Sequence, residues 1–188
     1  MGVVGSNPVC YADVRETIRD GWVLLHRSPG LLTRAIGVAG RSSYTHAEMA
    51  GWWHKRLMSL GMASCGGRAV PLSQLVRRRS GKIDVYSVVG LRPVDSIRAV
   101  DAMIDVIQAD YGWWNLAKIA LSHLPVVRWF VRPKLDDTLN GGVPTCGHAV
   151  SLALRAAHLD AVPNLADCRT EPADLSRSAI LKYEFTLT

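Results

Sequence analysis

The stretch Pro144-Thr-Cys-Gly-His-Ala-Val150 predicts the start of a helix that carries a cysteine in its first turn. Thr145 is a suitable N-cap, because its hydroxyl oxygen can accept a hydrogen bond from a backbone N–H that has no partner within the helix. The positive end of the helix dipole lowers the pKa of a cysteine placed there and favours its thiolate. Cys146 is therefore the candidate nucleophile, and backbone N–H groups of the same turn are candidate donors to an oxyanion.

The stretch Ser43-Tyr-Thr-His-Ala-Glu48 supplies the candidate base. It follows a turn cluster and predicts a strand over 44–50, whose alternation places Tyr44, His46, Glu48 and Ala50 on one face. A histidine held by a second polar group is the usual base for a nucleophilic cysteine, so His46 and Glu48 form the candidate pair. Tyr44 is a candidate to shape the cleft or to donate to the oxyanion, with plain packing as the open alternative.

The rest of the chain predicts an α+β fold. Further strands are expected over 21–26, 56–62 and 83–89, and together with 44–50 they would form one antiparallel sheet, with a turn at 51–55. Helices are expected over 93–111 and 146–158, because apolar residues recur there at helical spacing. A loop over 168–178 then leads into a last strand over 180–187. We expect one domain over residues 1–188, since the chain has the length of a single compact domain.

Composition limits the class of protein. The net charge of +6 and the pI near 9.4 favour an anionic surface or polymer as a partner. No basic and apolar leader opens the chain, and the longest apolar stretch, 113–131, is interrupted by charged residues and proline, so a cytoplasmic protein is expected, with peripheral membrane association or phage origin left open. Four cysteines without a signal sequence fit reduced thiols better than disulfides.

Five motifs, in this order, resemble the circularly permuted papain-like superfamily related to NlpC/P60 hydrolases, in the branch with YaeF/YiiX-like and lecithin:retinol acyltransferase-like members. The resemblance covers residues 18–187. It rests on the stretches Ile18-Arg-Asp-Gly-Trp-Val-Leu-Leu-His26, Ser43-Tyr-Thr-His-Ala-Glu48, Tyr111-Gly-Trp-Trp114, Pro144-Thr-Cys-Gly-His-Ala-Val150 and Thr170-Glu-Pro-Ala-Asp-Leu-Ser-Arg-Ser178. Trp22 stands where the family usually has an aspartate.

The resemblance implies a fold in which an antiparallel sheet packs against the helix that carries the nucleophile, with the histidine before the cysteine in the chain. It makes Cys146 the nucleophile and His46 the base. The family's third polar residue, usually on the strand after the histidine, has no clear match. Glu48 is our choice, and the rival candidates are Ser59, His54 and Ser64.

The implied activity is that of a thiol peptidase, amidase or acyl hydrolase that attacks an amide or ester carbonyl. Cell-wall peptide (murein) and lipid or acyl substrates are the range of the family. No metal and no organic cofactor is implied. Related sequences occur in bacteria and their phages, so a catalytically inactive basic binding or assembly protein is one alternative.

A zinc deaminase is the second alternative, because His46-Ala-Glu48 is similar to the H-x-E half of that signature. The other half is incomplete, since position 149 is alanine where the Cys-x-x-Cys spacing requires a second cysteine, so only His46, Cys146 and His148 remain as zinc ligands.

The basic run, the tryptophans and the remaining histidines give weaker evidence of function. The basic run Arg77-Arg-Arg-Ser80, flanked by Arg68 and Lys82, has no nucleic-acid motif beside it and is expected to be a solvated loop. Five tryptophans are candidates for a ligand groove, with core packing as the alternative: Trp52, Trp53, Trp113, Trp114 and Trp129. The histidines without an evident partner are expected to be structural: His26, His123 and His158.

Overall fold

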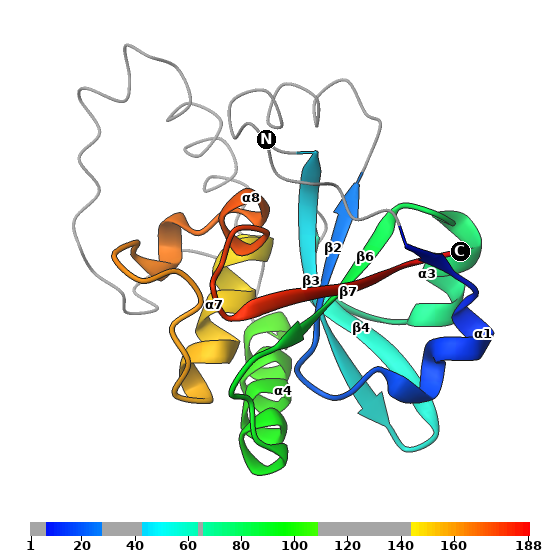
Figure 1. The fold of residues 1–188 in the computed structure, drawn as a ribbon. Coiled ribbons are helices and arrows are strands. Elements are labelled where there is room, and N and C mark those ends of the chain that lie inside the picture. Colours follow the sequence, from blue (N-terminus) through cyan, green and yellow to red (C-terminus); the bar gives the residue numbers. More distant parts are fainter. Residues whose placement is uncertain (1–6, 28–42, 64–65, 109–143) are drawn as a thin grey trace.

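A mixed sheet of seven strands forms the centre of the fold (Figure 1). The computed structural model describes residues 7–27, 43–63, 66–108 and 144–188. Its strands are β1 (Pro8–Val9), β2 (Val23–Arg27), β3 (Tyr44–Trp53), β4 (Arg56–Ala63), β5 (Gly66–Pro71), β6 (Ile83–Val88) and β7 (Leu181–Leu187). They follow the order β1-β7-β6-β2-β3-β4-β5, in which only β1 and β7 pair in parallel.

The longer helices cover one face of this sheet. The helices α4 (Pro93–Gln108) and α7 (Cys146–Ala156) lie side by side (Figure 1) and bury small and apolar side chains against β2, β3 and β4. Met103 of α4 and Ala149 of α7 are completely buried there, with Leu25 and Met49 of the sheet. The first turn of α7 is thereby held close to β3, which is the strand with the candidate base.

The other face of the sheet is covered by shorter segments. Here α3 (Leu72–Arg78) packs Leu72 and Leu75 against Leu24, Ala50 and other strand residues. The remaining helical turns are α1 (Tyr11–Val14), η1 (Arg15–Thr17), η2 (Asp167–Arg169) and α8 (Pro172–Leu175). Figure 1 shows α8 next to α7, so the end of the chain returns over the helix that carries Cys146.

Three predictions of local structure were wrong. The strand β3 runs on to Trp53 because its last residues pair with β4, which reduces the turn at 51–55 to His54 and Lys55, with His54 at a φ of 53°. The segment 168–178 holds η2 and α8, where a Glu171 capping box starts the helix, instead of a plain loop. The run Arg77-Arg-Arg-Ser80 begins in the last turn of α3, where basic side chains suit the negative end of the helix dipole.

The predicted face of Tyr44 was also wrong. Pairing between β2 and β3 changes register from His26↔His46 to Arg27↔Tyr44, so Thr45 has no counterpart and forms a bulge. A bulge shifts the alternation of side chains by one residue. Tyr44 therefore lies on the face opposite His46, Glu48 and Ala50.

Among the described residues, no helix combines the length and the apolar character needed to cross a membrane.

Candidate functional site

Cys146 lies in the first turn of α7, as the sequence predicts. Thr145 is its N-cap, and its Oγ1 accepts a hydrogen bond from the backbone N–H of His148 at 3.3 Å. Gly147 faces the chain segment before α8, where an added Cβ would lie 2.1 Å from the carbonyl oxygen of Thr170. Only glycine fits this close approach, so the segment after η2 packs directly against the turn that carries the sulfur.

The thiol of Cys146 lies close enough to the ring of His46 for each group to shift the pKa of the other. Burial by itself would raise the pKa of Cys146, but the positive charge of His46, their hydrogen bond and the backbone N–H groups of Ala47 and Gly147 lower it below its usual value. Burial would likewise lower the pKa of His46, yet the Cys146 thiolate and Glu48 raise it to about 9. Both shifts favour a thiolate–imidazolium pair near neutral pH.

Glu48 lies behind His46 and is completely buried. Its Oε1 is 3.2 Å from Nε2 of His46, which leaves Nδ1 of that ring for Cys146. Burial would raise the pKa of Glu48, but contacts with His26 and His46 keep it well below its usual value. The structure thus brings Cys146, His46 and Glu48 together in one chain of contacts, which is the order that a nucleophile, a base and an orienting acid require.

Three further side chains hold the Glu48 carboxylate, one each from β5, β4 and β2. Arg68 donates to Oε1 through Nε at 2.9 Å and Nη2 at 2.7 Å. Ser59 donates to Oε2 at 2.6 Å. Nε2 of His26 lies 2.9 Å from Oε2, a close contact that is poorly aligned as a hydrogen bond.

Sequence reasoning missed two of these residues. In the sequence Arg68 stands beside a basic run that is expected to be solvated, and His26 has no evident partner. The signal was in the register: β5 pairs Arg68 with Gly61, and Glu48 approaches Gly61 so closely that an added Cβ would lie 2.6 Å from its Cγ. A glycine in mid-strand can mark such a close approach of a neighbouring side chain. That signal becomes readable only when β5 is recognised as a strand.

Tyr44 belongs to a different cluster. Its hydroxyl donates to Asp84 at 2.5 Å and lies 2.9 Å from the hydroxyl of Tyr86. Burial and these hydrogen bonds raise the pKa of Tyr44. These contacts place the Tyr44 hydroxyl in a buried network on the face of the sheet opposite Glu48, instead of beside His46.

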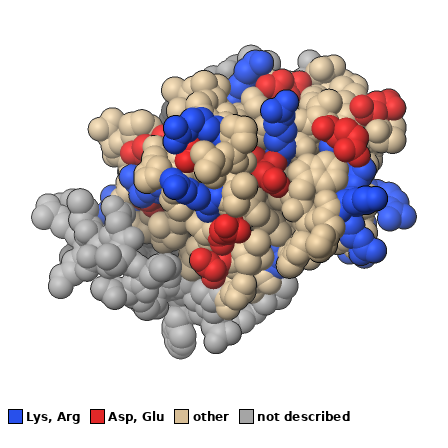
Figure 2. Space-filling model, turned by 90° about the horizontal axis from the view of Figure 1, so that it is seen from below, with Lys and Arg blue, Asp and Glu red and all other residues tan. Residues whose placement is uncertain are grey.

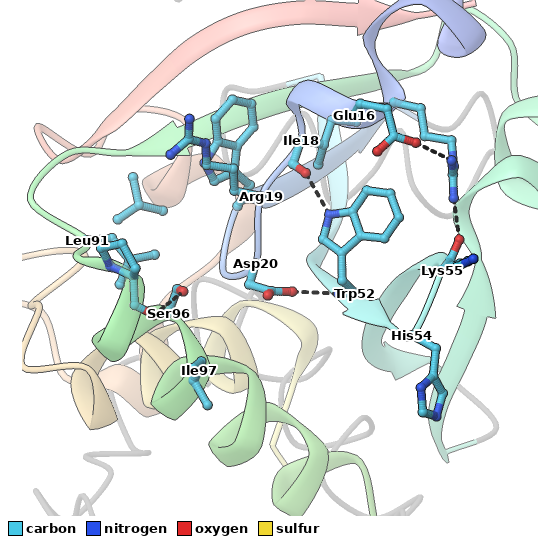
Figure 3. A pocket seen from close by; sticks show the side chains of 14 residues that line it. Glu16, Ile18, Arg19, Asp20, Trp52, His54, Lys55, Leu91, Ser96 and Ile97 are labelled. Carbon is cyan, nitrogen blue, oxygen red and sulfur yellow. Dashed lines mark hydrogen bonds and ion pairs between the residues drawn. The ribbon is translucent and has the colours of Figure 1, made fainter.

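The other candidates for the third residue of the site are Ser59, His54 and Ser64. Ser59 donates its hydroxyl to Glu48, so its hydrogen bond goes to the acid behind the His46 ring. His54 lies in the turn after β3 and lines a pocket of about 810 Å³ with Trp52 (Figure 3). Ser64 lies outside the described residues.

The pocket of Figure 3 is formed by the segment before β2, the β3–β4 turn and the start of α4. Trp52 is held there by its indole N–H, which donates to the carbonyl oxygen of Ile18 at 2.8 Å, while Trp53 is 53% exposed. The pocket lies at the end of β3 that is remote from His46, and its lining does not include the chain of contacts from Cys146 to Glu48. The remaining tryptophan candidates and one histidine lie outside the described residues: Trp113, Trp114, Trp129 and His123.

Charge is mixed on the surface that Figure 2 shows, where lysine and arginine side chains alternate with aspartate and glutamate. The net positive charge is thus not gathered into one continuous patch on that face. Within the described ranges, no group of three or more histidine, cysteine, aspartate or glutamate residues is arranged to hold a metal ion. Cys10 is exposed, and Cys146 and Cys168 are partly exposed.

The comparisons identify the fold. The structure is similar to the crystal structure of metalloprotein yiiX from Escherichia coli O157:H7, with a TM-score of 0.65 and 13% sequence identity, over 89% of this chain and 97% of that chain. The chain therefore has a YiiX-like α+β fold. No protein-family model matches the chain, and no curated protein matches its sequence significantly.

Proposed function

We propose that this protein is a cysteine-dependent hydrolase or acyl-transferase that attacks an amide or ester carbonyl. The observation that carries the proposal is the contact chain from Cys146 through His46 to buried Glu48, with the sulfur in the first turn of a helix. A structural cysteine needs neither a lowered pKa nor a histidine whose second nitrogen is held by a carboxylate.

The proposed reaction uses only these groups. The Cys146 thiolate attacks the carbonyl carbon, and the C=O electron pair moves to oxygen, which a helix N-terminal N–H stabilises. The imidazolium of His46 gives its proton to the departing nitrogen or oxygen as that bond breaks, which leaves a thioester. Neutral His46 then takes a proton from water as the water attacks, and the carboxylic acid leaves as the C–S bond breaks. An alcohol or amine in place of water gives acyl transfer.

We further propose that the fold is a circularly permuted papain-like one, in the NlpC/P60 superfamily and its branch with lecithin:retinol acyltransferase-like members. The order of the site supports this, since the base on β3 precedes the nucleophile on α7 by 100 positions. The similarity to yiiX is consistent with it. The proposed substrates are peptide, murein or acyl lipid.

The similar protein, yiiX, is described as a metalloprotein. For this chain, the zinc alternative would use His46, Cys146 and His148 as ligands. The contacts favour the thiol mechanism, because Nε2 of His46 faces Glu48, and the His46 ring and Cys146 shift each other's pKa toward the charged pair. Adding a chelator in the experiment below distinguishes the thiol mechanism from the zinc alternative.

The experiment measures turnover of an activated ester and of a murein peptide, together with the rate at which iodoacetamide alkylates each cysteine at pH 6.5. We expect Cys146 to react much faster than Cys10 or Cys168, because its thiolate is favoured at neutral pH. Cys146→Ser and His46→Ala should lower kcat at least about 10³-fold, while EDTA changes nothing.

Cys168→Ser is the matched control and should keep full activity, with circular dichroism as the folding check for every variant. Equal alkylation of all cysteines, or turnover that survives Cys146→Ser, would show that the site is not catalytic. Activity that a chelator removes and zinc restores would favour the metal alternative. Binding to an anionic polymer that is unaffected by Cys146→Ser, without turnover, would favour the basic binding protein.

A further inference from the structure

We propose that Arg68 is a positioning residue that orients Glu48 toward His46 and balances the charge of the site. This inference rests on the proposed function, and its evidence is the set of contacts around the Glu48 carboxylate. Within the described part of the chain, the hydrogen bonds of Arg68 go to Glu48, and none joins its guanidinium to the sulfur or to the His46 ring. Arg68 thus acts through Glu48.

Contacts to both oxygens fix the orientation of the Glu48 carboxylate. Its Oε1 accepts two N–H groups of Arg68, at 2.9 and 2.7 Å, and faces His46 at 3.2 Å. Its Oε2 accepts from Ser59 at 2.6 Å. A guanidinium is a rigid fork, so two N–H groups on one oxygen fix the direction of that oxygen better than a lysine ammonium does. Arg68 therefore aims Oε1 at the His46 ring.

The register explains why an arginine on β5 reaches a carboxylate on β3. Arg68 pairs with Gly61 of the intervening strand β4. Gly61 has no side chain, and an added Cβ would lie 2.6 Å from Cγ and 3.3 Å from Oε1 of Glu48. The absence of that atom allows the carboxylate and the guanidinium to meet across β4. The Arg68 side chain is 27% exposed and forms the solvent side of the cluster.

The charge balance of the cluster also supports a role for Arg68. In the active form Cys146 and Glu48 each carry one negative charge, and His46 carries one positive charge. His26 is completely buried, and that burial lowers its pKa, so it is neutral. Arg79, at the C-terminal end of α3, is a further positive charge that acts on the His26 ring, whereas Arg68 donates two hydrogen bonds to Glu48 itself. Arg68 is thus the cation that brings the buried cluster from a charge of −1 to zero.

Loss of the Arg68 charge should change the pKa of the neighbouring acidic groups in a predictable direction. A site with a net negative charge holds protons more tightly, so the pKa of Cys146 and of Glu48 would rise. Less Cys146 is then thiolate at neutral pH. A role of Arg68 in stability alone would lower the melting temperature but would not move the pH at which Cys146 becomes reactive.

The experiment follows alkylation of Cys146 by iodoacetamide from pH 4 to 9, by mass spectrometry, in the full chain. For Arg68→Met we expect the midpoint to move up by roughly one pH unit, since an opposite charge nearby shifts a pKa by about 1–3 units and this one acts across Glu48. Arg68→Lys should restore most of the midpoint, because it keeps the charge. Arg92→Met is the matched control: it removes an arginine from the buried Asp95 at the start of α4 and should leave the midpoint unchanged.

A double variant decides whether Arg68 acts through Glu48. In a Glu48→Gln background, Arg68→Met should move the midpoint much less than it does alone. An unchanged midpoint in Arg68→Met, or equal shifts with and without Glu48, would overturn the proposal. If Arg68→Met does not fold, the alkylation midpoints of Arg68→Lys and Arg68→Gln are compared instead. The proposal expects the midpoint of the lysine variant to lie closer to that of wild type, because lysine keeps the positive charge. The readout needs no substrate, so a failure to find hydrolysis would leave this result intact.

Discussion

Two buried carboxylates, Glu48 and Asp84, lie on opposite faces of the same sheet. Both side chains are completely buried, and each meets an arginine and at least one hydroxyl at nearly equal distances. Arg68 is 2.7 Å from Glu48, and Arg27 is 2.7 Å from Asp84. The two clusters therefore surround a buried carboxyl group in the same way, because such a group is tolerated away from water only when it is paired and hydrogen-bonded.

The clusters differ in their remaining partners. Asp84 is bound by Tyr44, whose pKa is raised, so its proton stays in place at physiological pH. Glu48 faces His46, whose pKa of about 9 lies within reach of ordinary conditions and whose ring also contacts a cysteine. Asp84 thus pairs with a hydroxyl that keeps its proton, whereas Glu48 pairs with a ring that can titrate, as the proposed mechanism requires.

The largest difference between the clusters is expected when each carboxylate is made neutral. Glu48→Gln should lower kcat by roughly 10–10⁴-fold, because the amide neither stabilises the imidazolium nor holds its tautomer. Asp84→Asn should lower the free energy of unfolding, on the order of 2 kcal/mol, since Arg27 loses its charge partner, and should leave kcat within a few-fold of wild type. The measurements are steady-state kinetics and urea unfolding.

The comparison fails if Asp84→Asn lowers kcat as much as Glu48→Gln does while the protein stays folded. It fails equally if Glu48→Gln retains full activity.

The pH dependence of turnover should reflect only the Glu48 side of the sheet. His46 is charged below its pKa of about 9, so kcat should fall above that pH as the imidazolium loses the proton that the leaving group needs. At acid pH, kcat should fall as the Cys146 thiolate takes a proton, at a pH below the usual thiol pKa. The two limbs belong to the coupled pair and not to either residue alone.

A profile in Tyr44→Phe tests the contrast, because that variant removes the hydroxyl that donates to Asp84. Its limbs should coincide with those of wild type. A basic limb that moves with Tyr44→Phe would place the tyrosine in the reactive site after all.

The sequence predicted the local placement of Cys146 and His46 more reliably than their surroundings, for a local reason. An N-cap threonine before Cys146 and alternation in His46-Ala-Glu48 are read within a few residues of the chain. The contacts of Arg68 and His26 with Glu48 depend on which strands pair and in which register, and this information is spread over β2, β3, β4 and β5. Tyr44 shows the same limit: a single bulge at Thr45, set by pairing with β2, reversed the face that a regular strand predicts.

The smallest expected effect concerns the side-chain hydroxyl that donates to each carboxylate, a contact that is nearly the same in the two clusters. Ser59 donates to Glu48 at 2.6 Å, and Thr186 donates to Asp84 at 2.6 Å. Removing either hydroxyl takes one hydrogen bond from a buried charge, so Ser59→Ala and Thr186→Ala should each lower the free energy of unfolding by about 1–3 kcal/mol. Only Ser59→Ala should also lower kcat, by a few-fold, because Oε2 of Glu48 loses one support while Arg68 still holds Oε1.

Steady-state kinetics on the activated ester, beside urea unfolding of both variants, measures the two quantities separately. Equal losses of stability with unequal losses of kcat would show that the same hydrogen bond serves stability on one face and orientation on the other. A larger kcat loss in Ser59→Ala than in Glu48→Gln would instead make Ser59 the third member of the site. In that case the acid on β3 would only support a hydroxyl on the following strand.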